Sequence, residues 1–257
     1  MPMVENEYAN ALGIRVNAVD LGQTIDRCEE LMKLGRRGYV CVTGVHGAME
    51  AQTDPEFRAV LNGSFLTVPD GVPLVWVGRL QGRRTMSRVY GPDLMIELCR
   101  QSVATGYRHF LYGGNYGVAE NLAERLRQRI PGIQIVGTYT PPFRPLSAEE
   151  ECELQRQVAA CKPDIFWVGL STPKQERFMA HYLDQLDTKL MIGVGAAFDI
   201  HTGRIKDAPK WIKSLGLQWL HRLIQEPRRL WRRYLVNNPK FILRILLQLI
   251  GVVRYST

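Results

Sequence analysis

Asp70 stands directly after a short apolar run and directly before a glycine. The run, residues 64–68, is rich in residues that favour β-strands, and Pro69-Asp70-Gly71 has strong turn chemistry. An aspartate in such a turn often does no more than bond to its own backbone. A carboxylate held at the end of a strand is also a candidate for site chemistry, so both roles of Asp70 stay open.

Other polar or glycine-rich segments follow apolar runs in the same way. They are residues 43–46 (TGVH), 113–114 (GG), 171–175 (STPKQ) and 195–199 (GAAFD). In an open parallel α/β sheet, ligands bind outside the carboxyl ends of the strands. We therefore expect these segments, including Thr43 and His46, to share one crevice with Asp70.

The segment YGGNYG, residues 112–117, follows a predicted strand and opens a predicted helix. Small residues allow close backbone approach, and a helix N-terminus supplies free amides and a positive dipole, as a bound phosphate requires. A tight turn needed only for packing would use Gly113 and Gly114 equally well. The segment is not G-x-G-x-x-G and no persuasive ribose-binding acid follows it, which disfavours an NAD-dependent enzyme.

Residues 171–176 combine hydroxyl caps with Pro173 at a first helical position. We expect the polar heads of Lys174 and Gln175 to point into the crevice, although a plain helix start would use the same residue types. Arg88 follows a basic loop and could clamp a phosphate, but taken alone it is typical of solvated surface.

Strands and helices alternate about six times along the chain. The predicted strands are residues 39–42, 64–68, 109–112, 133–137, 164–170 and 190–195, and helical spacing separates them. Helix starts are indicated at Asp54-Pro55 and by a capping box at Ser147 and Glu150. This pattern predicts an α/β, Rossmann-like fold with a mainly parallel sheet and helices on both faces. We expect this core in residues 1–203 and a basic helical appendage in residues 204–257.

The composition is that of a soluble globular protein, with 46% hydrophobic and 23% charged residues among 257. The five cysteines are scattered without a C-x-x-C pair, as in a reducing cytoplasm. The amino terminus has acidic residues and no apolar region of the kind found in signal peptides. The five histidines lack zinc-ligand spacing, so no metal site is expected.

Positive charge is concentrated near the carboxyl end. Residues 204–244 contain eleven Lys and Arg against two acidic residues, whereas the net charge of the whole chain is +8. The rest of the chain is therefore close to neutral. Such a concentrated field suggests an anionic partner: nucleic acid, a nucleotide or an anionic membrane surface.

The same region is amphipathic. Apolar residues between Trp219 and Leu235 fall on one helical face, with arginines around them, which is typical of a helix that binds a membrane surface. A helix packed on the domain with a solvated basic face is the alternative. Residues 241–253 are apolar but too short to span a core of ~30 Å, so we expect them in the membrane interface or against a second subunit. Deleting residues 237–257 should then release the protein from liposomes.

Seven segments, taken in order, carry a family resemblance. They are DPEFR (54–58), PDG with VW (69–76), RVYGPDL (88–94), YGG (112–114), PKQE (173–176), GAAFD (195–199) and QEPRRLWRRYL (225–235). Together they resemble the WecG/TagA/CpsF glycosyltransferases over most of the chain.

The resemblance implies transfer of a hexosyl or N-acetylhexosaminyl group from a UDP-sugar onto a polyprenyl-diphosphate-linked saccharide, with inversion, in cell-surface or exopolysaccharide synthesis. It implies a peripheral enzyme at the cytoplasmic face of the inner membrane. The residue roles that it implies are Asp70 as general base, Thr43, Arg88 and Gln175 as pocket residues, and Arg222, Arg229 and Arg232 as tail arginines folding over the diphosphate.

Two departures from the family pattern bear on sugar identity. The family often has an asparagine just after the position of Thr43, where this chain has Gly44-Val45-His46. An arginine of the family is replaced by Asp207.

Inverting transfer needs a base for the acceptor hydroxyl and positive charge on the departing diphosphate. Many nucleotide-sugar enzymes supply that charge through a metal on a D-x-D motif, which this chain lacks. We therefore expect arginines and helix-terminus amides to replace the metal, without another cofactor.

The alternative function is a non-catalytic nucleotide or nucleic-acid binding protein that uses the basic segment to bind phosphates. The leading interpretation involves no nucleic acid, and a homo-oligomer is left open.

Overall fold

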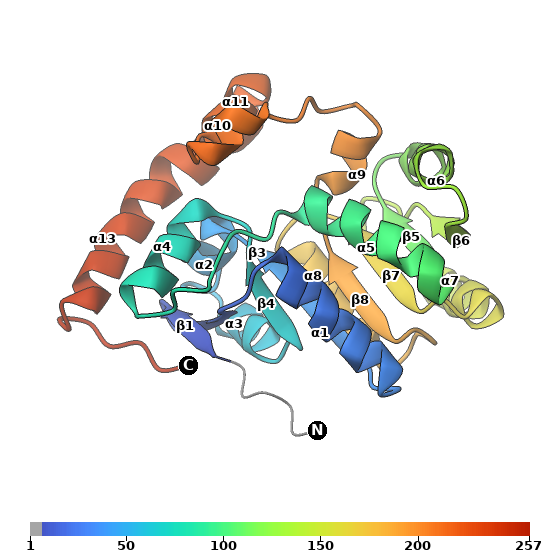
Figure 1. Cartoon of the computed structure of the whole chain (residues 1–257), viewed down its shortest axis with the longest axis horizontal. Helices are drawn as coiled ribbons and strands as arrows, with labels where there is room; N and C mark the ends of the chain where they lie inside the picture. The colour runs from blue at the N-terminus through green and yellow to red at the C-terminus, as the bar shows by residue number, and fades with distance from the viewer. Residues whose placement is uncertain (1–6) are drawn as a thin grey trace.

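The computed structural model describes residues 7–257, although not the side chains of Lys210 and Ser214. Its centre is a six-stranded, all-parallel sheet with the spatial order β4-β3-β8-β7-β5-β6 (Figure 1). The strands are β3 (Gly38–Thr43), β4 (Leu66–Pro69), β5 (Arg108–Gly113), β6 (Gln134–Tyr139), β7 (Ile165–Gly169) and β8 (Leu190–Gly193). The predicted parallel α/β fold is confirmed.

The strands β3, β4, β7 and β8 are apolar along nearly their whole length, so they are buried on both faces of the sheet. The edge strand β6 is mostly half-buried. Successive side chains alternate between the two faces. On β7, Trp167 belongs to one core cluster, whereas Phe166 and Val168 belong to the other. Trp167 is fully buried.

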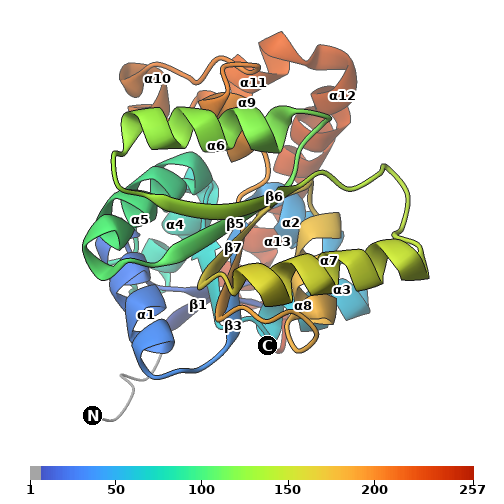
Figure 2. The same cartoon turned by 90° about the vertical axis from the view of Figure 1, so that its right-hand side faces the viewer.

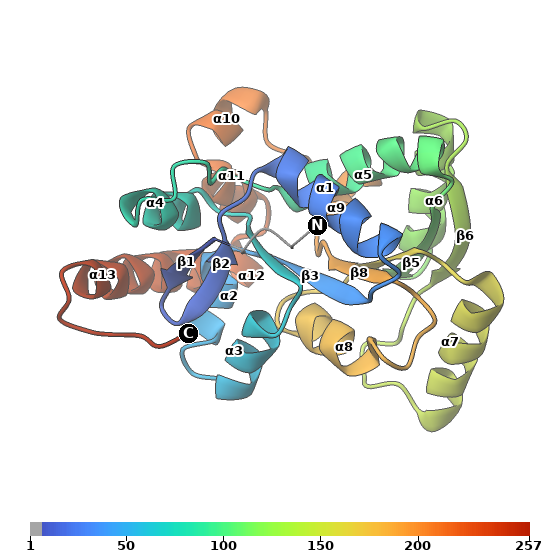
Figure 3. The same cartoon turned by 60° about the horizontal axis from the view of Figure 1, so that its bottom comes forward.

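Helices cover the two faces (Figures 2 and 3). The first layer contains α1 (Leu21–Lys33), α5 (Gly91–Thr105), α6 (Val118–Arg129) and α9 (Ala197–His201). The second contains α2 (Val45–Glu50), α3 (Pro55–Asn62), α7 (Ala148–Cys161) and α8 (Lys174–Tyr182). Both predicted helix starts are confirmed. Asp54 accepts a hydrogen bond from the amide of Phe57 (2.9 Å), and Ser147 forms the capping box with Glu150.

A buried histidine ties three of these elements together. Trp167 on β7 donates its indole N–H to Nδ1 of His109 on β5 (3.0 Å). Nε2 of His109 lies 2.7 Å from Oγ of Ser102 on α5, and Ser102 donates its own hydrogen to the carbonyl of Cys99. Since Nδ1 accepts, the proton of the neutral ring sits on Nε2, and every polar atom of the group is paired.

Two short elements were not expected from the sequence. An antiparallel hairpin of β1 (Tyr8–Ala11) and β2 (Ile14–Asn17) turns at Leu12 and Gly13, which both have positive φ (57° and 86°). Leucine rarely adopts this conformation, so the residue types carried no turn signal. The helix α2 starts directly after Gly44, where no side chain caps it and only a loop was indicated.

The C-terminal region forms α10 (Lys210–Ser214), α11 (Gln218–Gln225), α12 (Pro227–Trp231), a π-helical turn (Arg232–Val236) and α13 (Asn237–Leu249). Phe241 and Ile245 on α13 are buried in the second core cluster. The amide of Gln248 bonds to the hairpin, accepting from the N–H of Leu12 and donating to the carbonyl of Asn10 (3.0 and 2.8 Å). Within residues 7–257, none of the helices has the length and apolarity needed to cross a membrane.

Candidate active site

The sheet has a switch point between β3 and β8, which are neighbours. The chain leaves β3 for α2 in one helical layer, but it leaves β8 for α9 in the other. Ligands bind at such points in open α/β sheets, because the two following loops diverge and leave a crevice.

Asp70 lies at this edge, directly after β4 and before α4 (Val72–Leu80). Its backbone N–H donates to the carbonyl of Thr43 (2.9 Å), which joins the ends of β4 and β3. A Cβ added to Gly71 would lie 3.8 Å from Cα of Gly44, so the two loops are in close contact. The Asp70 side chain is 36% exposed and therefore accessible to a ligand.

The carboxyl group of Asp70 is partly enclosed by protein, with arginines near it. Burial raises its pKa above the ordinary value, although Arg88, Arg233 and Arg222 act to lower it. A raised pKa makes the carboxylate a stronger base. Arg88 donates to the backbone carbonyl of Asp70, but its Nη2 lies 3.4 Å from the carboxylate, which is long for a charged hydrogen bond. The carboxylate is therefore only weakly paired.

Arg88 joins the core to the C-terminal helices. Its guanidinium lies 4.4 Å from the ring centroid of Tyr90 and also donates to the side chain of Gln218 on α11. The hydroxyl of Tyr90 donates to Asp207 (3.0 Å). Asp207, which replaces the arginine of the resembled family, thus anchors the segment that precedes α10.

The residues around the start of α8 leave polar atoms unpaired. Gln175 and Glu176 are 3% and 1% exposed. Thr43 Oγ1, Gln175 Oε1 and Glu176 Oε2 are buried without a hydrogen-bond partner. A Cβ added to Gly47 would lie 3.0 Å from Cγ2 of Thr43 and 3.7 Å from Cγ2 of Thr172, so β3 and the β7–α8 loop meet here. Because buried polar atoms are almost always paired, these oxygens mark a place for donors from a ligand.

His46 is kept neutral at this site. Burial lowers its pKa to about 4, and the nearby positive charge of Arg233 adds to the shift. Its Nδ1 lies 3.6 Å from Glu50 and has no hydrogen-bond partner. A neutral imidazole can bind a ligand hydroxyl without adding charge.

Two of the C-terminal arginines, Arg222 and Arg233, lie near Asp70. Both lower its pKa, and the Nε atom of each is buried without a partner. Arg222 also forms an ion pair with Glu226 (3.3 Å). Burial lowers the pKa of Arg233, whereas the negative charge of Asp70 acts to raise it.

The other two predicted arginines lie at the surface. Arg229 forms an ion pair with Glu226 at 2.6 Å and its side chain is 56% exposed. Arg232 is exposed, with its guanidinium 5.2 Å from the ring centroid of Trp231. The structure thus brings Arg222 to the crevice together with Arg233, which the sequence did not single out.

The two glycines of the predicted phosphate cradle, Gly113 and Gly114, pack closely against neighbouring protein atoms. A Cβ on Gly113 would lie 2.6 Å from the carbonyl oxygen of Gly169, and one on Gly114 would lie 2.8 Å from Val118. Both glycines have positive φ (127° and 77°). Close packing alone therefore explains why glycine is needed at both positions. Lys174 is exposed at the start of α8.

Three residues of the site escaped the sequence interpretation. Glu176 belongs to a predicted helix start and to the PKQE segment, but neither pattern indicated a role for its side chain, and Gln218 carried no signal. Arg233 was one of several arginines on an amphipathic segment, and an α-helical wheel cannot identify it because a π-turn changes which residues face inward.

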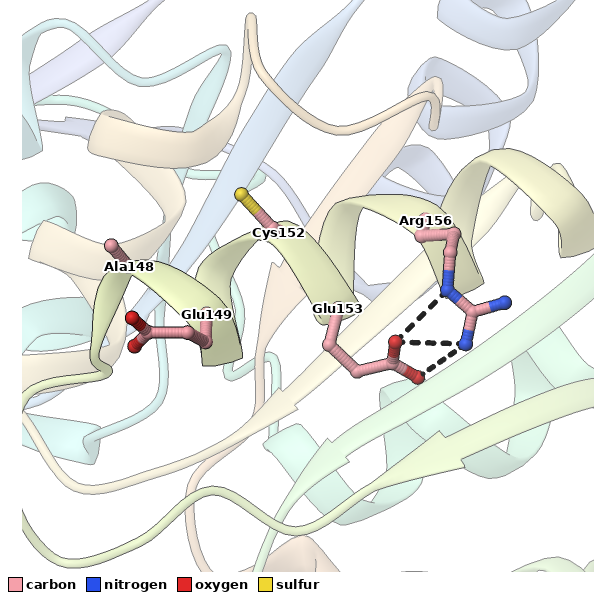
Figure 4. A pocket seen from close by; sticks show the side chains of 5 residues that line it. All are labelled: Ala148, Glu149, Cys152, Glu153 and Arg156. Atoms are coloured by element: carbon pink, nitrogen blue, oxygen red, sulfur yellow. Dashed lines mark hydrogen bonds and ion pairs between the residues drawn. The ribbon is translucent and has the colours of Figure 1, made fainter.

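A separate depression lies on the outside of α7, lined by Ala148, Glu149, Cys152, Glu153 and Arg156 (Figure 4). Glu153 and Arg156 form an ion pair across it (2.8 Å). All five residues come from one helix, which lies at the opposite end of the molecule from α13 (Figures 1 and 3). The depression is therefore not part of the crevice. In the part of the chain that the structure describes, no group of three His, Cys, Asp or Glu could hold a metal ion.

Comparison with known proteins identifies the family to which the chain belongs. The profile of the "Glycosyl transferase WecG/TagA/CpsF family" matches residues 9–254. The chain belongs to this glycosyltransferase family. Family membership favours the enzyme over the nucleic-acid binding alternative.

Two curated Bacillus proteins are similar to this glycosyltransferase over most of its length. One from Bacillus spizizenii is 33% identical over 197 residues, which cover 77% of this chain and 74% of the relative. One from Bacillus subtilis is 33% identical over 199 residues, covering 77% and 75%. Both are named N-acetylglucosaminyldiphosphoundecaprenol N-acetyl-beta-D-mannosaminyltransferase.

Proposed function

We propose that this glycosyltransferase moves an N-acetylhexosamine from a UDP-sugar onto a polyprenyl-diphosphate-linked N-acetylglucosamine, with inversion at the anomeric carbon. The acceptor and the sugar type follow the names of the Bacillus relatives, in which the transferred sugar is N-acetylmannosamine. The observation that carries the proposal is the meeting of Asp70, whose carboxylate lies 3.4 Å from Arg88, with Arg233, whose buried Nε has no hydrogen-bond partner.

The reaction assigns one role to each charge. Asp70 accepts the proton of the acceptor hydroxyl, whose oxygen attacks the anomeric carbon from the face opposite UDP. The bond between that carbon and the β-phosphate oxygen breaks, and UDP leaves with the bonding electron pair. Arg222 and Arg233 stabilise the negative charge that develops on the diphosphate.

The remaining predicted residues support substrate binding in this scheme. Thr43, His46 and Gln175 line the crevice near Asp70, and Arg88 holds the loop that carries it. Arg229 and Arg232 are exposed on the segment that carries Arg233, and from there they would attract the diphosphates of both substrates from solvent. Gly113, Gly114 and Lys174 stay candidates for contacts with the nucleotide.

We also propose that the enzyme binds the cytoplasmic face of the membrane as a peripheral protein. α4 and α13 lie side by side at one end of the molecule (Figures 1 and 3). Exposed apolar side chains occur on α4 and along the C-terminal segment from α10 to the residue that caps α13: Trp76, Leu80, Trp211, Leu220, Ile224, Trp231, Leu235, Ile242, Leu243, Leu246, Leu249 and Ile250. Exposed Arg228, Arg229 and Lys240 on the same helices would contact anionic lipid headgroups.

The deciding experiment measures UDP release across a panel of UDP-sugars, with a short-chain polyprenyl-diphosphate N-acetylglucosamine as acceptor. We expect acceptor-dependent release with one N-acetylhexosamine donor and a β-linked product by NMR. A retained anomeric configuration would contradict in-line displacement. Absence of release with every donor would contradict the proposed function.

A further inference from the structure

Glu176 is a buried carboxylate next to Gln175, in the first turn of α8, and it is 1% exposed. Its Oε1 accepts two hydrogen bonds, from the hydroxyl of Thr172 (2.8 Å) and from Nε2 of Gln175 (3.0 Å). Its Oε2 has no partner. The mechanism above gives this acid no role, yet burying a carboxylate is costly unless it serves a purpose.

The carboxylate fixes which way the Gln175 amide points. Burial raises the pKa of Glu176, whereas the hydrogen bonds from Gln175 and Thr172 and the positive charge of Arg233 favour its ionised form. An ionised carboxylate only accepts hydrogen bonds, so the amide turns its NH₂ group towards Glu176 and its carbonyl oxygen away from it. That carbonyl oxygen is the buried, unpaired Oε1. Turning the amide over would place two oxygens against each other.

The end of β8 leaves space for the fixed amide. A Cβ added to Gly193 would lie 3.1 Å from Cδ and Nε2 of Gln175, and one added to Gly195 would lie 3.5 Å from Oε1. β3 pairs with β8 so that Cys41 lies opposite Gly193, which brings Thr43 to the same end of the sheet as Gly195. The Gln175 oxygen therefore borders the crevice beside the unpaired hydroxyl of Thr43.

We propose that Glu176 is a positioning residue that makes Gln175 a hydrogen-bond acceptor in the crevice. The ligand group that Gln175 binds must then be a hydrogen-bond donor and not a phosphate oxygen. The substrates offer such donors in sugar hydroxyls, in acetamido N–H groups and in the N3–H of uracil. We assign Gln175 to a sugar, and the comparison of UDP with UDP-sugar below distinguishes this from binding to uracil. This inference rests on the proposed function, since it assigns part of that site to the sugar.

The test replaces Glu176 with glutamine, which is nearly isosteric. The new side chain can donate a hydrogen bond, so the Gln175 amide is free to turn its NH₂ into the crevice. We expect Glu176→Gln to weaken sugar binding about tenfold, the loss of roughly one hydrogen bond. If Gln175 binds the donor sugar, the Kd for UDP-sugar rises while that for UDP stays constant. If it binds the acceptor sugar, only the KM for the acceptor rises.

A second variant separates orientation from simple damage to the fold. It exchanges the pair, Gln175→Glu with Glu176→Gln, so that the amide introduced at position 176 donates to the carboxylate introduced at position 175. The second oxygen of that carboxylate again faces the crevice as an acceptor. We expect the exchange to restore sugar binding to within about threefold of wild type. The matched control is Glu56→Gln, the same change at a side chain that is 87% exposed, which should leave every constant unaltered.

Equal losses for UDP and UDP-sugar, no loss at all, or no recovery in the exchanged pair would each overturn the inference. The proposed function is tested separately, by measuring the turnover of the wild-type enzyme. If the wild type transfers sugar while Glu176→Gln keeps its full preference for UDP-sugar and its acceptor KM, only the role of Glu176 is wrong.

Discussion

Asp70 and Arg233 approach one another from distant parts of the chain, and neither has a close ionic partner. Asp70 lies 3.4 Å from Arg88, and the buried Nε of Arg233 is unpaired. A protein that leaves a base and a cation unsatisfied at the same edge keeps both available for a substrate. The chemistry of the site thus depends on individual charges more than on any one motif.

The first prediction concerns Asp70 as the base. Asp70→Asn should retain UDP-sugar affinity within about threefold while kcat falls on the order of 10²- to 10⁴-fold, because the amide cannot accept the proton. In the wild type, kcat/KM should fall as the pH drops through the raised pKa of Asp70, since the protonated acid is inactive. Asp187→Asn, at an exposed carboxylate paired with Arg37, is the control and should be fully active. Undiminished turnover of Asp70→Asn would exclude Asp70 as base.

Single residues were only partly predictable from the sequence. Thr43, His46 and Gln175 follow strands, so strand ends alone identify them. Their unpaired oxygens and nitrogens depend on packing between β3 and α8, which no local pattern encodes. Glu176 escaped notice because an acid in a first helical turn is ordinary.

Among the elements, the π-turn between α12 and α13 has the strongest effect on the site. It includes Arg233, and α12 places Leu230 in the core while Arg229 stays at the surface. The helical segment that contains this turn is attached to the core at two points. Gln218 bonds to Arg88 before the turn, and Gln248 bonds to the hairpin after it. The sequence predicted a basic amphipathic segment here, but not the turn type that orients it.

The second prediction compares the two arginines on either side of Leu230. Arg233→Gln should lower kcat about 100-fold, as expected when one donor to the developing charge is lost. Arg229→Gln should change kcat less than about threefold, because an exposed ion pair contributes little. Steady-state kinetics with saturating acceptor measure both. A larger loss for Arg229 would mean that the tail rearranges when substrate binds.

The third prediction concerns the buried link between α5, β5 and β7. Burial lowers the pKa of His109 to about 4, whereas an unfolded histidine titrates near ~6.5. Between these values the unfolded chain binds a proton that the folded chain does not, so the free energy of unfolding falls as the pH falls. One such group contributes up to about 1.4 kcal/mol per pH unit.

Urea unfolding from pH 7.5 to 4.5 measures this slope. His109→Phe should be less stable than wild type at pH 7.5 by about 2 kcal/mol, because Trp167 loses its acceptor, but it should lose less on acidification. Leu34→Ser, at an exposed side chain that does not titrate, is the control and should keep the wild-type slope. An unchanged slope in His109→Phe would assign the effect to His46 and His201, whose pKa values are also lowered by burial.

The molecule as a whole is asymmetric, because α4 and α13, which both carry exposed apolar side chains, lie together at one end (Figures 1 and 3). The alternation of strands and helices was sufficient to predict the fold, because period and length are local properties. The boundary expected at residues 203 and 204 stays a prediction. Which side of α13 is buried was not predictable, since residues 241–253 are apolar nearly all round.

The fourth prediction refines the liposome experiment. Deleting residues 237–257 would also remove Phe241 and Ile245 from the core. A loss of liposome binding in that variant could then result from unfolding. The triple change Ile242→Ser, Leu246→Ser and Leu249→Ser removes only exposed side chains. It should release the protein from anionic liposomes in co-sedimentation, while Leu34→Ser with Val103→Ser should not. Full retention of the triple variant, with a change in oligomeric state, would identify this face as a subunit interface.

The central position of β8 has a consequence for how the chain reaches its native state. β4 and β3 form one part of the sheet and β7, β5 and β6 form another, and β8 alone joins them. A growing chain on the ribosome can therefore pair each part separately, but the sheet closes only after residue 193 has emerged. Such long-range closure is slow and exposes unpaired strand edges meanwhile. The crevice between β3 and β8 is thus among the last features to form, and the arginines that complete it are synthesised later still.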